Sequence, residues 1–526
     1  MHGPSRRFLS GHALPDTGLF RQLIQHTKNP ASVAVVDSGG QIHSYRDVMN
    51  QALHLKKILG KDGDLSQDHV AFLLPNSSAY VATQWGIWAA GGVAVPLCTS
   101  HPVGELEYIL KDSEAKSIIL GEGDTKQEGI FAERIKPLAK QLDIPIHTLP
   151  PHPTSLSTDQ LSMIPFDTER GAMMIYTSGT TGRPKGVLST HKAVQHQTES
   201  LVKAWGWTSK DRILHTLPLH HVHGVINAMV CAHYAGATVE FGPERFDAAW
   251  MWKRWRGQTG TTDPITLFTG VPTMYNRLVD QANKEGMSPE QGREATRQIR
   301  LMMSGSSPLT TVLRSQWKEL TSHTLLERYG MTETGMITGG SYEDPSKRVQ
   351  GCVGWPFPGV EVRLDEGTGE VQVRGPSLFK EYWRKEEATK ASFTQHGWFR
   401  TGDTGTWDEQ GGLRLLGRSS VDIIKTRGYK VSALEVEGAI MSQVPGIREC
   451  AVIGVEDEAW GQKVMAILVQ EEGSSHPRLE AKEIRHQLKD TLAPYKLPSQ
   501  IQYLSSLPRN QMGKVNKKGL IKDYVY

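Results

Sequence analysis

Short apolar runs recur along the first 300 residues, separated by longer stretches with a helical pattern. The runs are Ser32–Asp37, Val70–Leu74, Lys116–Leu120, Ala172–Tyr176, Thr238–Gly242, Ile265–Thr269 and Ile299–Met303. Alternation of strands and helices is typical of α/β proteins, in which helices cover largely parallel sheets. We therefore expect this part of the chain to form layered α/β sheets.

An uncharged and largely apolar run, Tyr80 to Cys98, approaches the length of a membrane span. Gln84, the Gly91-Gly92 pair and Pro96 interrupt both its apolar character and any continuous helix. The run is better interpreted as a buried helix, a glycine turn and a buried strand. We expect no membrane span.

The pattern changes after about residue 345, where glycines separate alternating strands in VEVRLDEGTGEVQVRG and GLRLLGRSSVDIIKTRG. Such segments favour an antiparallel or barrel-like sheet. A smaller α+β unit follows, with helices expected near 432–442 and 479–492 and strands near 449–455 and 464–469. We predict a large N-terminal domain, residues 16–417, and a small mobile C-terminal domain, residues 418–526.

Composition and charge exclude several classes of function. The 526 residues carry a net charge of +3 without any run of Lys or Arg, so nothing favours nucleic acid or a membrane surface as a partner. The four cysteines lie far apart, which suits a reducing compartment better than a zinc site or a disulfide framework. Residues 1–15 contain Arg6 and Arg7 but no acid. They fit a remnant of a mitochondrial transit peptide or, equally well, a disordered tail.

Residues 177–186 read TSGTTGRPKG and follow a predicted strand. Glycines let backbone N–H groups approach an anion closely, and the hydroxyls together with Lys185 add donors and charge. The order differs from a Walker loop, because Pro184 and Gly186 stand where its second glycine and its metal-binding hydroxyl belong. The segment therefore predicts a phosphate-binding loop of a different kind.

Four further motifs are weak individually. In ERYGMTE, Glu333 offers a carboxylate for Mg²⁺, and Tyr329 offers a ring that can stack on a base. SGSSP, residues 304–308, offers a tight turn. Asp403 in RTGD, together with the later Arg418, offers a carboxylate and a cation that can bind a ribose. PRNQMGK places Lys514 in a flexible loop near the end of the chain.

Together and in this order, the five motifs resemble those of the adenylate-forming superfamily, which contains acyl-CoA synthetases, luciferases and peptide-synthetase adenylation domains. The resemblance covers nearly the whole chain. It implies two steps: a carboxylate attacks the α-phosphate of ATP to give acyl-AMP and pyrophosphate, and a thiol then takes the acyl group while AMP leaves. ATP, Mg²⁺ and coenzyme A are the implied cofactors and substrates.

The resemblance also implies residue roles. Lys514, Thr180 and Glu333 would be catalytic, and Thr180 and Glu333 would lie at Mg²⁺. Lys514 would bridge the substrate carboxylate and the α-phosphate. The nucleotide would contact Thr177, Ser178, Gly179, Thr180, Thr181, Gly182, Arg183, Pro184, Lys185, Ser304, Gly305, Ser306, Tyr329, Gly330, Thr332, Asp403 and Arg418. The hinge segment, Gly417–Asp422, is one residue longer than the usual pattern, which puts Ser420 or Val421 at the pivot.

The acyl pocket of such enzymes is implied to be lined by PLHHVHG, residues 218–224, and by the segments before the adenine turn. His221 matches a recurring family histidine, while His223 and Arg277 are unusual polar additions. A buried cation suits a dicarboxylate, whose distal carboxylate would pair with Arg277. The blocks LPLHHVHGV, GVPTMYNRL and GYKVSALEVE resemble the malonyl-CoA synthetases, above all their animal mitochondrial members.

We therefore predict a malonate–CoA ligase of the mitochondrial matrix, with malonate or methylmalonate as the acid. A medium-chain or aromatic acyl-CoA synthetase is the first alternative. A peptide-synthetase adenylation domain would need an acidic pocket residue, and none lies in PLHHVHG. A non-catalytic relative would have lost one of Lys514, Glu333 and Asp403, and all three are present. The sequence leaves the oligomeric state open.

Overall fold

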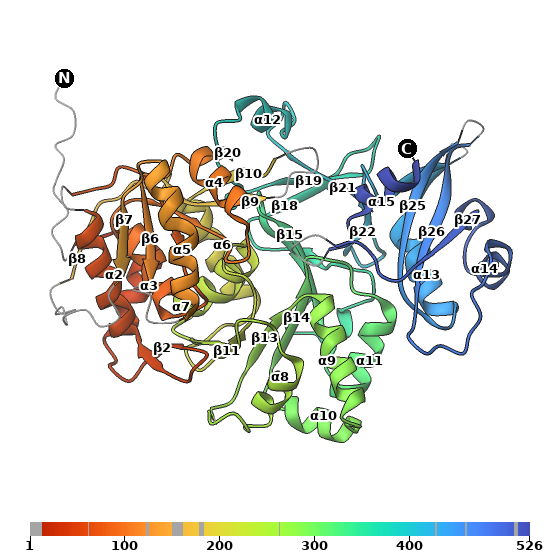
Figure 1. Ribbon diagram of the computed structural model, residues 1–526, viewed down its shortest axis with the longest axis horizontal. Coiled ribbons are helices and arrows are strands. Elements are labelled where there is room, and N and C mark those ends of the chain that lie inside the picture. The colour runs from red at the N-terminus through yellow and green to blue at the C-terminus, as the bar shows by residue number, and fades with distance from the viewer. Residues whose placement is uncertain are drawn as a thin grey trace.

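Two large sheets run through the N-terminal part of the computed structural model (Figure 1). The structure describes residues 13–60, 63–121, 126–149, 161–177, 183–261, 263–426, 429–457, 460–509 and 514–525. The segment 178–182, most of the predicted phosphate loop, and residues 1–12 lie outside these ranges.

The first sheet has seven strands. In spatial order they are β20 (Glu381–Tyr382), β10 (Lys185–Thr190), β9 (Gly171–Thr177), β5 (Val93–Pro96), β4 (His69–Leu73), β6 (Ser117–Gly121) and β7 (Ile146–Leu149). The five from β9 to β7 are parallel neighbours, while β10 and β20 at the other end pair in antiparallel. The five parallel strands agree with the α/β prediction from sequence.

The second sheet has nine strands and is parallel from β15 to β2. In spatial order they are β17 (Trp355–Pro356), β16 (Gly335–Gly339), β15 (Leu326–Met331), β14 (Leu301–Gly305), β13 (Leu267–Gly270), β11 (Arg212–His215), β12 (Thr238–Phe241), β2 (Val33–Val36) and β3 (Ile42–Ser44). A separate parallel pair joins β1 (Ala13–Pro15) to β8 (Ser162–Ile164).

Helices form three layers around these sheets. One continuous apolar core joins both sheets to the helices between them, α1 (Gly18–Thr27), α2 (Tyr45–Leu59), α3 (Ser78–Ala89), α6 (His191–Ala204), the π-helix η2 (His223–Val230) and α7 (Cys231–Ala235). The outer face of the first sheet packs on α4 (Val103–Asp112) and α5 (Lys126–Gln141). The outer face of the second sheet packs on α8 (Ala248–Trp255), α9 (Pro272–Lys284), α10 (Pro289–Thr296) and α11 (Thr311–Thr321).

The long uncharged run forms α3, a turn and β5, as the sequence predicts. A helix that is apolar on every side belongs in a core, and α3 is enclosed between the two sheets. Gly91 makes the turn with φ of 75°, a left-handed conformation that costs glycine little. No helix in the described ranges combines the length and the apolar character needed to cross a bilayer.

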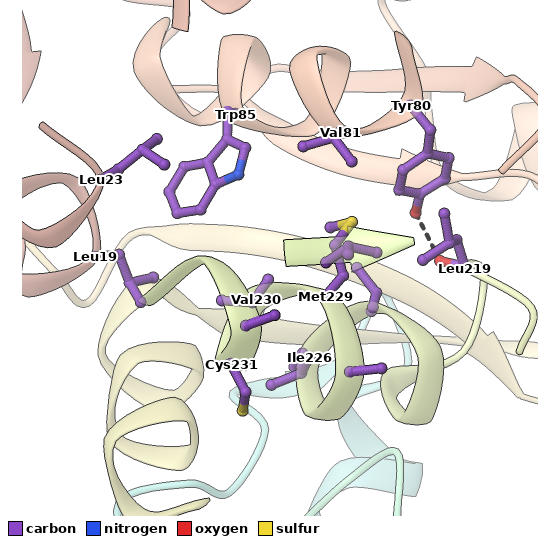
Figure 2. Packing of buried hydrophobic residues seen from close by; sticks show 14 of the residues in the cluster. Leu19, Leu23, Tyr80, Val81, Trp85, Leu219, Ile226, Met229, Val230 and Cys231 are labelled. Atoms are coloured by element: carbon purple, nitrogen blue, oxygen red, sulfur yellow. Dashed lines mark hydrogen bonds between the residues drawn. The ribbon is translucent and has the colours of Figure 1, made fainter. Parts of the chain in front are cut away.

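The contact between α3 and η2 fixes the loop that leads into η2. Figure 2 shows Trp85 and Val81 of α3 above Ile226, Met229 and Val230. At the end of this contact the hydroxyl of Tyr80 donates to the backbone oxygen of Leu219, at 2.6 Å. Leu219 immediately precedes His220 and His221, so the core holds the histidine segment in place.

Residues 361–418 form a four-stranded antiparallel sheet, with α12 (Glu386–Ala391) between its second and third strands. Its strands are β18 (Glu361–Leu364), β19 (Glu370–Arg374), β21 (Phe399–Trp407) and β22 (Leu413–Arg418). The antiparallel prediction is confirmed. In the described part of the chain the two end strands do not pair with each other, so the sheet is open and the predicted barrel-like closure is absent.

The remaining residues form a separate α+β unit on the right of Figure 1. Its strands are β23 (Ile423–Thr426), β24 (Tyr429–Ser432), β25 (Ile447–Asp457), β26 (Gly461–Gln470) and β27 (Gln500–Leu504). Helices α13 (Ala433–Gln443) and α14 (Ala481–Leu488) cover one face, and α15 (Lys517–Val525) covers the other. The large and small units agree with the predicted fold class, although α14 is shorter than the helix expected over 479–492.

Candidate active site

Four polar side chains meet at the carboxyl edge of the second sheet. Thr269 is the last but one residue of β13, Ser306 follows β14, Arg328 lies on β15, and His223 begins η2 after the loop that follows β11. In a parallel sheet the carboxyl ends of neighbouring strands share one edge, where ligands usually bind. Ser306 adopts φ of 67°, a left-handed conformation that few non-glycine residues take.

Hydrogen bonds fix the state of His223. Nη2 of Arg328 lies 2.7 Å from Nδ1 of His223, and Nε2 of the ring lies 2.9 Å from Oγ1 of Thr269. Because a guanidinium can only donate, Nδ1 accepts and Nε2 carries the proton that is donated to Thr269. Burial, followed by the charge of Arg328, holds the pKa of His223 well below its usual range. The ring is therefore neutral.

Arg328 is a buried cation, with 3% of its surface exposed. Burial lowers its pKa to about 9, and in the described ranges no Asp or Glu forms an ion pair with it. Its buried Nε has no hydrogen-bond partner there either. The neighbouring Glu327 is paired with Arg314 of α11 at 2.8 Å. Successive strand residues point to opposite faces, so Glu327 and Arg328 lie on different sides of β15.

Asp403 and Arg418, the two residues predicted to bind ribose, form an ion pair. Asp403 and Arg418 are directly opposite on β21 and β22, and Nε of Arg418 lies 2.8 Å from Oδ1 of Asp403. The hydroxyl of Tyr329 donates to Oδ2 of Asp403 at 2.6 Å. Burial raises the pKa of Asp403, although Arg418 and Tyr329 act in the opposite direction. Tyr329 thus orients the carboxylate through its hydroxyl, a contact that the sequence did not indicate.

Lys185 and Glu333 converge on Tyr382 of β20. The ammonium of Lys185 lies 4.7 Å from the centre of the Tyr382 ring, and the Tyr382 hydroxyl donates to Oε1 of Glu333 at 2.8 Å. Lys185 is paired with Thr177 across the two strands that flank the undescribed loop segment. The hydroxyl of Tyr108 donates to the backbone oxygen of Pro184 at 2.7 Å and braces the same end of the loop.

Lys514 lies close to the Asp403–Arg418 pair and to the histidine segment that leads into η2. Burial, followed by the charge of Arg418, lowers its pKa, while Asp403 acts to raise it. The charge of Lys514 is also felt by His221 and His223, whose pKa values are lowered mainly by burial. The tail lysine, the carboxylate–arginine pair and the histidine segment therefore share one site, although they lie far apart in the sequence.

The other predicted nucleotide contacts lie at the same edge or at the rim of the loop. Ser304 and Gly305 end β14, Gly330 lies in β15, and Thr332 lies in the turn to β16. Arg183 is exposed, with its guanidinium 5.4 Å from the centre of the Tyr108 ring. Ser178, Gly179, Thr180, Thr181 and Gly182 lie outside the described residues.

Arg277 does not occupy the predicted position. It lies on the exposed face of α9, and its Nη2 donates to the backbone oxygen of Phe246 at 2.7 Å. The helix turns its apolar residues, among them Tyr275 and Leu278, towards the core and Arg277 towards solvent. The buried cation of the site is Arg328, a residue of the ERYGMTE motif for which the sequence predicts no separate role.

A metal fits Glu333 only as one carboxylate beside phosphate oxygens. No cluster of three or more His, Cys, Asp or Glu side chains in the described ranges is arranged to hold a metal ion. Mg²⁺ in nucleotide sites is usually bound by one or two carboxylates together with phosphates and water, so Glu333 suits this arrangement.

Comparison with known proteins agrees with this geometry. The AMP-binding enzyme family matches residues 23–383, and the AMP-binding enzyme C-terminal domain matches residues 435–514. The mitochondrial malonate–CoA ligase ACSF3 of Mus musculus is 42% identical, over 93% of this chain and 88% of the relative. The malonate–CoA ligase of Arabidopsis thaliana is 40% identical, over 96% and 88%.

Solved structures give the same result. The crystal structure of ATP-bound MatB from Rhodopseudomonas palustris superposes with a TM-score of 0.83 at 33% identity, covering 96% of this chain and 98% of that one. With the family match extending over more than half of its length, the chain belongs to the AMP-binding enzyme family.

Proposed function

We propose that this protein ligates malonate to coenzyme A at the expense of ATP, through a malonyl-adenylate, with release of pyrophosphate and AMP. The observation that carries the choice of acid is the buried guanidinium of Arg328, which has no carboxylate partner in the described ranges. The similarity to malonate–CoA ligases over more than nine-tenths of the chain supports the same choice.

A buried cation without a counter-ion is costly, and an anion that binds beside it removes that cost. We infer that the distal carboxylate of the acid binds to Arg328, with Thr269 and Ser306 as neighbouring hydroxyls. His223 would hold the guanidinium in position by accepting from Nη2. A fatty or aromatic acid would leave Arg328 unpaired. The same logic applies to methylmalonate, whose extra methyl group leaves both carboxylates in place.

ATP would lie between the phosphate loop and the Asp403–Arg418 pair. Residues 177–185 would hold the β- and γ-phosphates, and Asp403 would accept hydrogen bonds from the ribose hydroxyls. Glu333 and Thr180 would bind Mg²⁺, which would neutralise phosphate charge. Tyr382 would orient Glu333, since its hydroxyl donates to Oε1. Ser304 to Ser306 and Tyr329 to Thr332 would border the adenosine.

In the first step an oxygen of the acid's proximal carboxylate attacks the α-phosphorus. The bond from that phosphorus to the bridging oxygen breaks, and pyrophosphate leaves. Lys514 would bridge the attacking carboxylate and the α-phosphate, where negative charge accumulates. Its position near Asp403 and His223 supports this role. His221 would border the acid from the same segment.

In the second step the sulfur of coenzyme A attacks the acyl carbon, the thiol proton is released, and AMP leaves. Residues 418–526 would form the domain that moves between the two steps, with residues 16–417 as the body that holds the adenylate. A moving lysine suits this scheme, because Lys514 is needed for the first step and would obstruct the second.

We further propose that the protein acts in the mitochondrial matrix, in lipid metabolism. Support for a mitochondrial location comes from the animal relatives whose names include the word mitochondrial, and from the Arg-containing, acid-free residues 1–15.

The test of the whole proposal is product analysis with ATP, Mg²⁺, coenzyme A and malonate. We expect malonyl-CoA and AMP in equal amounts. Formation of ADP, or a higher rate with octanoate or a cinnamate than with malonate, would contradict it.

A further inference from the structure

Lys517 lies between two buried carboxylates at the start of α15. Its ammonium is 2.5 Å from Oδ1 of Asp422 and 2.6 Å from Oε1 of Glu437. The three side chains are between 10% and 16% exposed. Burial raises the pKa of Glu437, whereas the two carboxylates together raise the pKa of Lys517 despite its burial.

Each carboxylate also binds a backbone amide in another element. Oδ2 of Asp422 accepts from the amide of Arg418 at 2.9 Å, across the turn between β22 and β23. Oε1 of Glu437, on α13, accepts from the amide of Val452 on β25 at 2.7 Å. The ammonium of Lys517 therefore connects α15 to the turn at which the large and small units meet. Through Glu437 it also connects α15 to α13 and β25 of the small unit.

Lys514 is connected to this anchor through a short stretch of chain. Val515 forms an isolated antiparallel bridge with Arg509, and the amide of Asn516 donates to the backbone oxygen of Pro508 at 2.8 Å. The chain from Lys514 to Lys517 thus enters α15 along a fixed path. Asp422 contacts both Lys517 and the backbone of Arg418, whose side chain pairs with Asp403 beside Lys514.

An anchor of this kind has a use beyond stability. Replacing a buried ion pair by apolar residues often leaves a fold equally stable, so stability alone does not account for three charges here. An ionic contact between α15 and the turn would hold the chain that carries Lys514, and a misplacement of a catalytic group by about 1 Å costs roughly 100-fold in rate.

We propose that Lys517 is a positioning residue for Lys514, acting through Asp422 and Glu437 to hold the tail lysine at the reacting carboxylate during adenylate formation. The inference rests on the proposed two-step reaction. It predicts that Lys517 matters for the first step and not for the second, in which Lys514 has left the site.

The experiment compares Lys517→Met with Lys517→Arg and with Lys518→Met. Lys518 is the exposed neighbour on the same helix and serves as the matched control. For Lys517→Met, acid-dependent ATP–pyrophosphate exchange should fall by about 100-fold in kcat with little change in the KM of ATP. Thioester formation from preformed acyl-adenylate should stay within about threefold of wild type. Lys517→Arg should recover much of the exchange, and Lys518→Met should match wild type.

A purely structural role would lower both half-reactions together with the thermal midpoint, and that result would overturn the proposal. Exchange at the wild-type rate in Lys517→Met would overturn it as well. If Lys517→Met does not fold, Glu437→Gln retains the Lys517–Asp422 pair and should lower exchange by about tenfold with the second step intact. Exchange is driven by whichever acid gives wild type its highest rate, so a failure of malonate as substrate is seen in wild type and is separate from this test.

Discussion

The guanidinium of Arg328 and the imidazole of His223 meet inside the protein, with Nη2 of the arginine 2.7 Å from Nδ1 of the histidine. The ring is neutral and accepts, so it orients the cation without neutralising it. A buried positive charge thus remains at the carboxyl edge of the second sheet, beside the segment that leads into η2.

Arg328→Met should therefore raise the KM of malonate by about 100-fold, the size expected for losing a charge-assisted pair in a buried site. The KM of ATP should change little. Steady-state kinetics with each substrate varied in turn measures both. Arg277→Ala is the matched control, because that arginine is exposed on α9, and it should behave like wild type. A malonate KM that rises in Arg277→Ala but not in Arg328→Met would reverse the assignment.

The Tyr382–Glu333 hydrogen bond predicts a graded effect on magnesium. Tyr382→Phe removes the hydroxyl that orients Oε1 of Glu333 and should raise the Mg²⁺ concentration for half-maximal exchange by about fivefold, since one hydrogen bond is worth about 1 kcal/mol. At saturating Mg²⁺ its rate should approach that of wild type. Glu333→Gln should lose most exchange at any Mg²⁺ concentration. Identical magnesium titrations for all three proteins would remove Glu333 from the metal site.

The place of Lys514 predicts that the two half-reactions separate. Lys514→Ala should lower exchange by about 1,000-fold, as expected for removing a charge that stabilises the transition state. Thioester formation from preformed malonyl-adenylate should remain largely intact. Equal losses in both steps would be inconsistent with a lysine that acts only in the first.

Buried histidines predict acid sensitivity of the fold. Burial is the main cause of a lowered pKa at His69, His191, His215, His221, His223, His233 and His323. For His191, His215 and His233 the folded pKa falls to about 3, 4 and 3.

The unfolded chain binds protons at these rings below about pH 6.5, while the folded chain does not, so their contribution to stability is lost as pH falls. Each of the three should lose about 1 kcal/mol between pH 6.5 and 5.5. Burial raises the pKa of Glu327 to about 7, so near pH 6 the folded chain binds a proton there that the unfolded chain does not bind. This one group therefore adds stability as pH falls and offsets part of the loss. Thermal midpoints measured from pH 7.5 to 5.5 should fall, and a midpoint that rises towards pH 5.5 would contradict charge-free burial of these rings.

The sequence predicts much of the fold because its strands are short apolar runs in regular alternation with helices. All seven predicted runs are strands whose ends lie within two residues of the prediction, and the run around Gly91 folds as expected. That the antiparallel sheet stays open was not predictable from the sequence. It depends on whether β18 and β22 pair, and residues so far apart leave no local signal.

The family motifs name the residues of the site one by one, but they do not say which of their charges has a partner in the fold. Asp403 and Arg418 form an ion pair, and their charges act on Lys514, while the roles of all three stay predictions. The sequence predicts no role for Arg328, although it stands in the ERYGMTE motif. A signal was present, because Glu327 and Arg328 are adjacent charges in an otherwise apolar strand. Which of them has a counter-ion depends on Arg314 of α11, and only the fold shows that it pairs with Glu327. At the turn between the two units Asp422 contacts the amide of Arg418 and the ammonium of Lys517, contacts that the sequence does not indicate, and the pivot at Ser420 or Val421 stays a prediction.

Acid-dependent ATP–pyrophosphate exchange tests the central claim, that this site adenylates a short dicarboxylic acid, most directly. Malonate, methylmalonate, acetate and octanoate are compared side by side at equal concentration with the wild-type protein. Malonate is predicted to give the highest kcat/KM, with acetate and octanoate lower by roughly four orders of magnitude, because each would leave Arg328 unpaired. Octanoate exchanging faster than malonate would contradict the account.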